Sequence, residues 1–290
     1  MSRIGLFVLL AALAAFPQDA GEARTYELKS RLRAGQRYTA SNTVSFSVTT
    51  TIRQGDRTET YTESVQRTER FVDQVLRAGT NGVLEIDRTY LRLYTKARDE
   101  KTGRPSVYQS PMQGRRVKIT ENRRRRDVEL DGRGTVDPMV RRTAGMELDW
   151  RDIFPEDAMA PGDSWEADAS ALGRRLSAYL DCGNRTKIKI RFEEILERDG
   201  ARLAKLYVDL LLEGMRDRHL FTKVILAGDV YFDLDLNRVV EVDMTGTMSV
   251  GGATIGDGAP RIVKGEGPVS LKSTLKVSAL EAAVSAGDDE

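Results

Sequence analysis

The sequence of 290 residues contains one cysteine and one histidine, and these two shortages exclude several kinds of site. Cys182 has no second cysteine for an internal disulfide, so we expect a buried, inert thiol, with an intermolecular bridge as the alternative. His219 alone cannot form a histidine metal cluster, and no nucleophile motif surrounds it. The sequence predicts no cofactor, no metal site and no enzymatic activity. A carboxylate-based hydrolase acting on envelope glycans is the alternative, because a sequence cannot show how far apart two carboxylates lie.

An excess of charge of one sign is also missing, since 45 basic residues are balanced by 44 acidic ones. Attraction of the whole molecule to nucleic acid is therefore not expected, and we predict no nucleic-acid partner. After residue 16, no apolar run approaches the roughly 20 residues of a membrane-spanning helix, so we do not expect an integral membrane protein. Val, Leu and Ile dominate the apolar residues, which favours β-strands.

The first 20 residues have the three parts of a secretory signal peptide. Arg3 supplies a positive charge, residues 4–16 are apolar, and Ala-Leu-Ala at 12–14 offers small residues for cleavage. A buried N-terminal helix is the alternative interpretation. We predict an exported protein, periplasmic or extracellular, that is soluble after the signal peptide is removed.

Alternating apolar and polar side chains predict strands over most of the remaining chain. Residues 43–52, 186–200 and 268–280 show this alternation, and the Asn-Gly pair at 81–82 predicts a hairpin. We predict a mainly β fold, with long antiparallel strands in two similar curved sheets or half-barrels and a helical connector. The predicted segments are a signal peptide (1–20), a first β half (21–136), a helical connector (137–157), a second β half (158–282) and an acidic tail (283–290).

The connector carries the helical signals. Asp137-Pro138 suits a helix start, and residues 139–154 have apolar spacing closer to a helix, although Gly145 weakens the pattern. Pro155 would stop such a helix. A second segment, 169–180, fits either a helix or a strand.

Two short phrases in the sequence share a glycine followed three residues later by an aromatic residue. They are GQRY at 35–38 and GDSW at 162–165. Segments 70–79 and 191–200 also share an Arg-Phe start and a closing Arg-x-Gly. The two halves are therefore predicted to be a duplicated unit, in which glycine turns the chain and the aromatic residue enters the core. The alternative is that antiparallel proteins commonly reuse such turns.

One basic stretch could contact an anionic polymer or lipid headgroups. Residues 115–126 hold seven basic residues and one acidic residue. Asp127, Glu129 and Asp131 follow directly, so a solvated hairpin tip paired with acids is the alternative. The candidate anionic contacts are Arg115, Arg116, Lys118, Arg123, Arg124, Arg125 and Arg126.

Residues 233–241 (DLDLNRVVE) superficially resemble a calcium-binding loop. Arg238 stands at the sharp turn where such a loop requires glycine. The alternation of Leu234 and Leu236 instead predicts a strand with its carboxylates in water.

The phrases at 26–41 and 155–168 give the chain a resemblance to a loose group of exported bacterial β-proteins of unknown function. That group opens with a Tyr-x-Leu-Lys strand and a glycine–aromatic turn, and later carries Pro-x-x-x-Val/Met-x-x-Gly-Asp-x-Trp. Members often carry a lipid-attachment cysteine, which this chain lacks after its apolar run. No catalytic residue is implied, because the group has no established activity.

A long antiparallel sheet covered by a helix is also similar in architecture to open-barrel periplasmic carriers of lipoproteins or lipids. This likeness implies a non-enzymatic envelope protein that binds a hydrophobic ligand or a macromolecular partner, with the helix at 139–154 lying over a concave apolar face. A carrier predicts a cavity lined by Phe46, Val48, Ile190 and Phe192. A structural or adhesive module predicts that the same side chains close into a dry core.

Overall fold

The computed structural model describes residues 24–79, 84–99, 103–122, 125–130, 150–180, 182, 185–215, 219–256 and 259–277. The predicted signal peptide, the acidic tail and residues 137–149 of the predicted connector lie outside these ranges. Within them, twelve strands, one α-helix and one 3₁₀ turn are found. The elements are β1 (Arg37–Gln54), β2 (Arg57–Ala78), β3 (Leu84–Asp99), β4 (Pro105–Gln109), β5 (Arg116–Asn122), β6 (Arg125–Leu130), η1 (Arg151–Ile153), β7 (Ser164–Ala167), α2 (Ser170–Leu180), β8 (Arg185–Arg198), β9 (Ala201–Met215), β10 (Leu220–Asp233), β11 (Arg238–Gly256) and β12 (Ala259–Val277).

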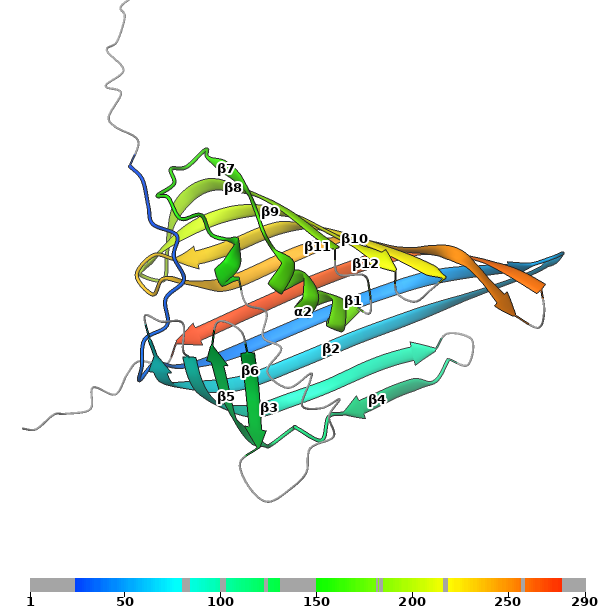
Figure 1. The fold of residues 1–290 in the computed structure, drawn as a ribbon, viewed down its shortest axis with the longest axis horizontal. Helices are drawn as coiled ribbons and strands as arrows, with labels where there is room; N and C mark the ends of the chain where they lie inside the picture. Colours follow the sequence, from blue (N-terminus) through cyan, green and yellow to red (C-terminus); the bar gives the residue numbers. More distant parts are fainter. Residues whose placement is uncertain are drawn as a thin grey trace, which may run out of the picture.

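All twelve strands belong to one antiparallel sheet, shown in Figure 1. Its order is β6-β5-β3-β2-β1-β12-β11-β10-β9-β8-β7, and β4 pairs with β3 outside this path. The chain starts in the middle, moves outward to β6, resumes at the opposite edge with β7 and returns to the middle. The mainly β, antiparallel prediction is confirmed. The two halves are not separate sheets, however, because β1 and β12 pair along most of their length and join them.

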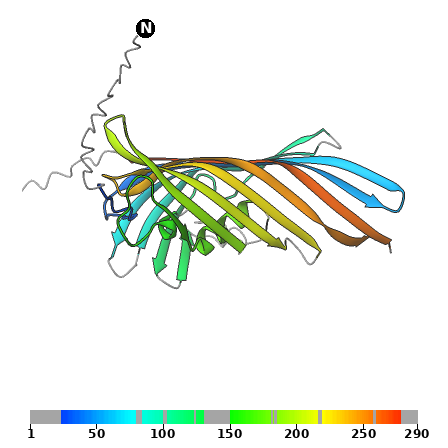
Figure 2. The same cartoon turned by 90° about the horizontal axis from the view of Figure 1, so that it is seen from above.

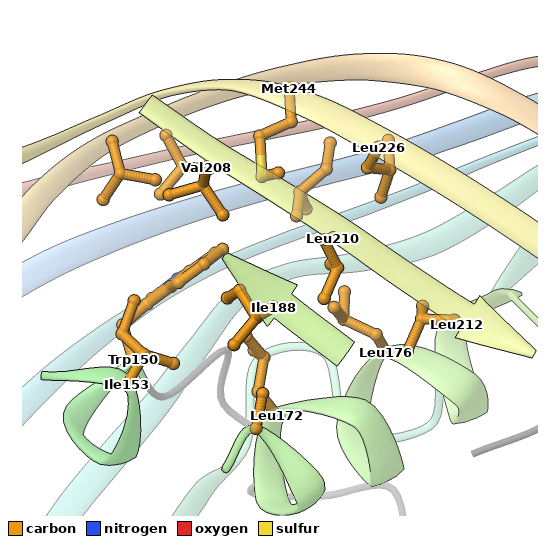
Figure 3. Packing of buried hydrophobic residues seen from close by; sticks show 14 of the residues in the cluster. Trp150, Ile153, Leu172, Leu176, Ile188, Val208, Leu210, Leu212, Leu226 and Met244 are labelled. Carbon is orange, nitrogen blue, oxygen red and sulfur yellow. The ribbon is translucent and has the colours of Figure 1, made fainter. Parts of the chain in front are cut away.

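Helix α2 lies against one face of this sheet, as Figures 2 and 3 show. Asp168 accepts the backbone N–H of Ser170 (2.9 Å) and its hydroxyl, which caps the helix start. Leu172, Leu176 and Leu180 repeat every fourth residue and are fully buried against the strands. This spacing settles the 169–180 segment as a helix. No helix in the described ranges is long and apolar enough to cross a membrane.

The part of the connector that the structure describes is a single 3₁₀ turn, η1. Trp150 and Ile153 are buried, and the Ile153 carbonyl accepts the Trp165 indole N–H at 2.8 Å. Phe154 is extended (ψ 142°), as a residue before proline prefers, so the helical turn ends where Pro155 predicts. Beyond α2, Cys182 packs against the same core. It is only half-buried, whereas the sequence predicted a buried thiol.

The two glycine–aromatic phrases form the same local structure. Gly35 and Gly162 both have positive φ (85° and 101°), which favours glycine. Gly35 N–H donates to the Val75 carbonyl and Gly162 N–H to the Phe192 carbonyl, at 2.8 and 2.7 Å. In each case the partner's own N–H donates back to the residue after the glycine. The glycine turns thus match Phe192 with Val75, whereas the similarity of 70–79 to 191–200 matches Phe192 with residue 71. Because the two alignments differ by four residues, duplication of the whole halves stays a prediction.

The segment expected to be a strand at Leu234 and Leu236 is a turn, which corrects that prediction. The Asp233 carboxylate accepts the backbone N–H groups of residues 235 and 236 at 2.9 and 2.8 Å, and this starts the turn early. Asn237 closes it at φ 54°. Asp235 pairs with Arg202 at 2.6 Å. Among the described residues, no group of three His, Cys, Asp or Glu side chains could hold a metal ion.

Candidate functional site

A continuous row of apolar residues crosses the face of the sheet on which α2 lies. Its members oppose one another directly from strand to strand over nine strands, so their side chains share this face. From β3 to β7 the row reads Ala97, Val65, Phe46, Val269, Gly246, Leu226, Leu210, Ile188 and Ala167.

The helix covers only part of this row. Leu172 and Leu176 of α2 point toward Ile188 and the end of β9 in Figure 3, and Ile188, Leu210 and Leu226 are at most 3% exposed. Toward the first half of the sheet, Ala97, Val65, Phe46 and Gly246 are only half-buried. Among the described residues, the apolar face therefore continues beyond the area that α2 covers.

A hollow of about 490 Å³ lies over the uncovered part of the row. Phe46, Val65, Ala97, Gly246 and Val269 line it, together with neighbouring residues of the same strands and two prolines from β4 and β12. Its volume is within the range of about 300–1,000 Å³ that is typical of ligand pockets. The site is an open apolar hollow beside a closed core.

The four predicted apolar residues are divided between these two environments. Phe46 lines the hollow. Val48, Ile190 and Phe192 are buried in the core cluster, at 4%, 0% and 0% exposure. Sequence reasoning missed Ala97, Gly246 and Val269 as neighbours of Phe46, because only the strand register brings them together.

A polar latch fastens α2 to the first half of the sheet. The Tyr179 hydroxyl donates to Glu69 on β2 at 2.6 Å, and Arg67 donates to the other Glu69 oxygen at 2.9 Å. The Arg67 guanidinium lies 4.4 Å from the centre of the Tyr179 ring. Burial, with the neighbouring Glu69 carboxylate, raises the pKa of Tyr179 well above its ordinary value. The latch thus depends on a neutral tyrosine.

Replacing Tyr179 with phenylalanine is expected to lower the free energy of unfolding by about 2 kcal/mol, because a hydrogen bond to a buried charge is lost. The wild-type advantage should shrink above pH of about 10, where tyrosine ionises in the unfolded chain but not in the fold. Urea denaturation at neutral and alkaline pH measures both effects. Tyr231→Phe is the control, since its hydroxyl makes a longer bond (3.3 Å) at a half-buried position. Equal losses in the two variants would contradict the latch.

A second buried polar cluster lies on the same face. Arg88 and Asp73 form a two-pronged ion pair (2.7 and 2.6 Å), and the Tyr38 hydroxyl donates to Asp73 at 2.8 Å. The exposure of Arg88 and Asp73 is 1% and 0%. The Arg88 guanidinium also stacks 3.7 Å from the centre of the Phe71 ring. The charges of Arg88 and Asp73 balance each other, so this cluster does not call for a ligand.

The structure describes the side chains of only part of the predicted basic stretch. Arg115, Arg116 and Lys118 are exposed. Arg116 contacts Asp87 at 2.5 Å and Lys118 contacts Glu85 at 3.8 Å, so β3 supplies the acids. The side chains of 123–126 (Arg123, Arg124, Arg125 and Arg126) lie outside the described residues. The described part supports the alternative of a solvated, acid-paired hairpin, and contact of the stretch with an anionic polymer stays a prediction.

No protein-family model matches the sequence, and no curated protein matches it. Solved structures with distant likeness include one on lipid–protein interactions in lipovitellin, with a TM-score of 0.44 and 10% identity over 88% of this chain. The chain spans 26% of that protein. An outer membrane channel from Pseudomonas putida F1 gives a TM-score of 0.27 and 8% identity, covering 86% of this chain and 97% of that one. Outer membrane protein AlkL gives 0.18 and 9%, covering 88% and 97%. At these scores the likenesses carry no functional argument.

Proposed function

We propose that the protein binds an apolar ligand, such as a lipid acyl chain, in the hollow over Phe46, as an exported, non-enzymatic envelope protein. The observation that carries the proposal is the apolar row that runs out from under α2 into an open hollow. Within the described residues this stretch has no cover, and a purely structural sheet gains nothing from that, because exposed apolar surface is unfavourable in water. The signal-peptide pattern at 1–20 supports the export part of the proposal.

The first test is to purify the chain gently and to combine native mass spectrometry with lipid extraction. A co-purifying apolar molecule at a one-to-one ratio is the expected result. If the protein is isolated empty, titration with a fluorescent fatty acid gives the affinity directly. An empty protein that also fails to bind the fatty acid would favour a structural or adhesive module.

Replacing Val65 with aspartate is expected to weaken fatty-acid binding at least about tenfold, because a carboxylate would have to be buried against the acyl chain. The control is Ile225→Asp. Ile225 is 45% exposed, and its neighbours Val224 and Leu226 are buried in the core, so it faces the opposite side of the sheet. Binding measured by fluorescence should be unchanged in the control.

A second variant protects this test against loss of folding. Ala97→Trp adds apolar volume at the half-buried end of the row, so it should reduce ligand uptake while leaving the melting temperature close to that of the wild type. Undiminished binding in both Val65→Asp and Ala97→Trp would place the ligand elsewhere.

A further inference from the structure

A second, smaller cavity of about 50 Å³ lies on the same face of the sheet, closer to the start of β1 and the end of β12. Ser30 and Leu32 of the segment before β1, Trp150, Arg151 and residues of five strands form its walls. Arg151 is paired with Glu121 at 3.2 Å. A single water molecule needs a cavity of about 10–15 Å³, so this cavity has room for a group of a few heavy atoms.

Arg238 lines this cavity, and no described acidic group forms an ion pair with it. Its exposure is 6%, and its Nη1 is buried without a hydrogen-bond partner. The guanidinium lies 3.9 Å from the centre of the Tyr38 ring, so Tyr38 covers one of its faces. Stacking of this kind leaves the edge of the guanidinium available for hydrogen bonds. A buried cation in this position calls for an anion.

Two carboxylates on this face are fully engaged by other groups, and a third is engaged through one oxygen. Asp73 is held by Arg88 and Tyr38, and Glu69 by Arg67 and Tyr179. Asp233 lies opposite Arg238 in the strand ladder, but one of its oxygens caps the following turn. Within the described part of the chain, no acidic group forms an ion pair with Arg238.

Two further residues with donor groups line the same cavity. The Trp150 indole N–H is buried without a partner, and indole can only donate. The Asn42 oxygen accepts the Ser273 hydroxyl at 2.7 Å, which leaves the amide NH₂ as the group that Asn42 can offer. Three residues with unused donor groups line one small cavity, which suits an acceptor-only ligand.

We propose that this cavity binds one oxyanion, a carboxylate or a phosphate group, held by Arg238, Trp150 and Asn42. Arg238 supplies the charge, and its planar fork matches two oxygens of such a group. Trp150 and Asn42 each donate one further hydrogen bond. The oxyanion can be a free ion or the head of an amphiphile. This site does not depend on the hollow over Phe46, because the two share no lining residue.

The test compares phosphate, acetate and chloride buffers at constant ionic strength, and oleate against oleyl alcohol. Melting temperature is measured for the wild type and Arg238→Gln. Trp165→Phe leaves Trp150 as the only tryptophan, so its emission reports on the cavity directly. The expected result is stabilisation and an emission change with an oxyanion, and an apparent dissociation constant at least about 30-fold higher in Arg238→Gln.

The variants also separate binding from a structural role. In chloride, Arg238→Gln should be no less stable than the wild type, since it removes an unpaired buried charge. Arg198→Gln is the matched control, because Arg198 also stacks on a tyrosine (4.8 Å, Tyr231) but is paired with Glu241 at 2.7 Å. It should keep the full oxyanion response.

Each outcome decides a point. A response to phosphate or acetate assigns a free ion, and a response to oleate but not to oleyl alcohol or acetate assigns an amphiphile head. No Arg238-dependent response to any oxyanion overturns the proposal. Val65→Asp should keep the response, so failure of this site and failure of the hollow can be distinguished.

Discussion

Asp73→Ala is expected to lower the free energy of unfolding by about 3–5 kcal/mol, because it strands the Arg88 guanidinium in the core. Both partners are at most 1% exposed, so water cannot replace the lost carboxylate. Tyr38 also loses the acceptor of its hydroxyl. Urea denaturation followed by circular dichroism measures the loss.

The matched control is Asp243→Ala. Asp243 pairs with Lys272 at 2.9 Å, but both side chains are about half exposed, and exposed pairs contribute roughly 0–1 kcal/mol. The double variant Asp73→Leu/Arg88→Met removes both buried charges and should recover much of the stability. Similar losses in Asp73→Ala and Asp243→Ala would show that burial does not set the strength of the pair.

The second large effect is expected at Gly246 in the apolar row. A Cβ at this position would lie 1.8 Å from the backbone carbonyl oxygen of Ile225 on β10. Backbone atoms of a paired strand cannot move aside as a side chain can. We expect Gly246→Ala to lose more than about 3 kcal/mol of stability, or to fail to fold.

Gly251, on the same strand, provides the comparison. A Cβ there meets only the Val263 carbonyl oxygen, at an ordinary contact distance of 4.0 Å. Gly251→Ala should therefore change the melting temperature little. A soluble, cooperatively melting Gly246→Ala with wild-type stability would show that β10 and β11 can separate at this point without cost.

Most of the fold could be predicted because its signals are local. Alternation identified strands such as β1 and β12. The single sheet could not be predicted, since nothing local in β1 indicates that its neighbour is β12. The turn at Leu234 was missed because the capping carboxylate of Asp233 outweighs the alternation of two leucines.

The candidate sites were harder to predict for the same reason. Phe46 could be assigned to an apolar face, but its neighbours around the hollow come from five other strands. Charge density pointed to the basic stretch at 115–126. Of its three cations with described side chains, Arg116 and Lys118 are paired with acids. The isolated Arg238 attracted notice only as a misplaced residue in a calcium-like loop. An unpaired charge can be recognised only when its surroundings are known.

The pairing of β1 with β12 also determines how this chain must fold. Ser45 and Ser270 are hydrogen-bonded across 225 residues, whereas the other long neighbouring strands follow one another in the chain. Closing so large a loop costs entropy before its contacts form, so we expect each meander to assemble first and the central seam to close last. Tyr38 opposes Val277, which places the start of β1 beside the end of β12. The strand order is that of a circularly permuted meander, and we expect closure of its seam to be the slow step of folding.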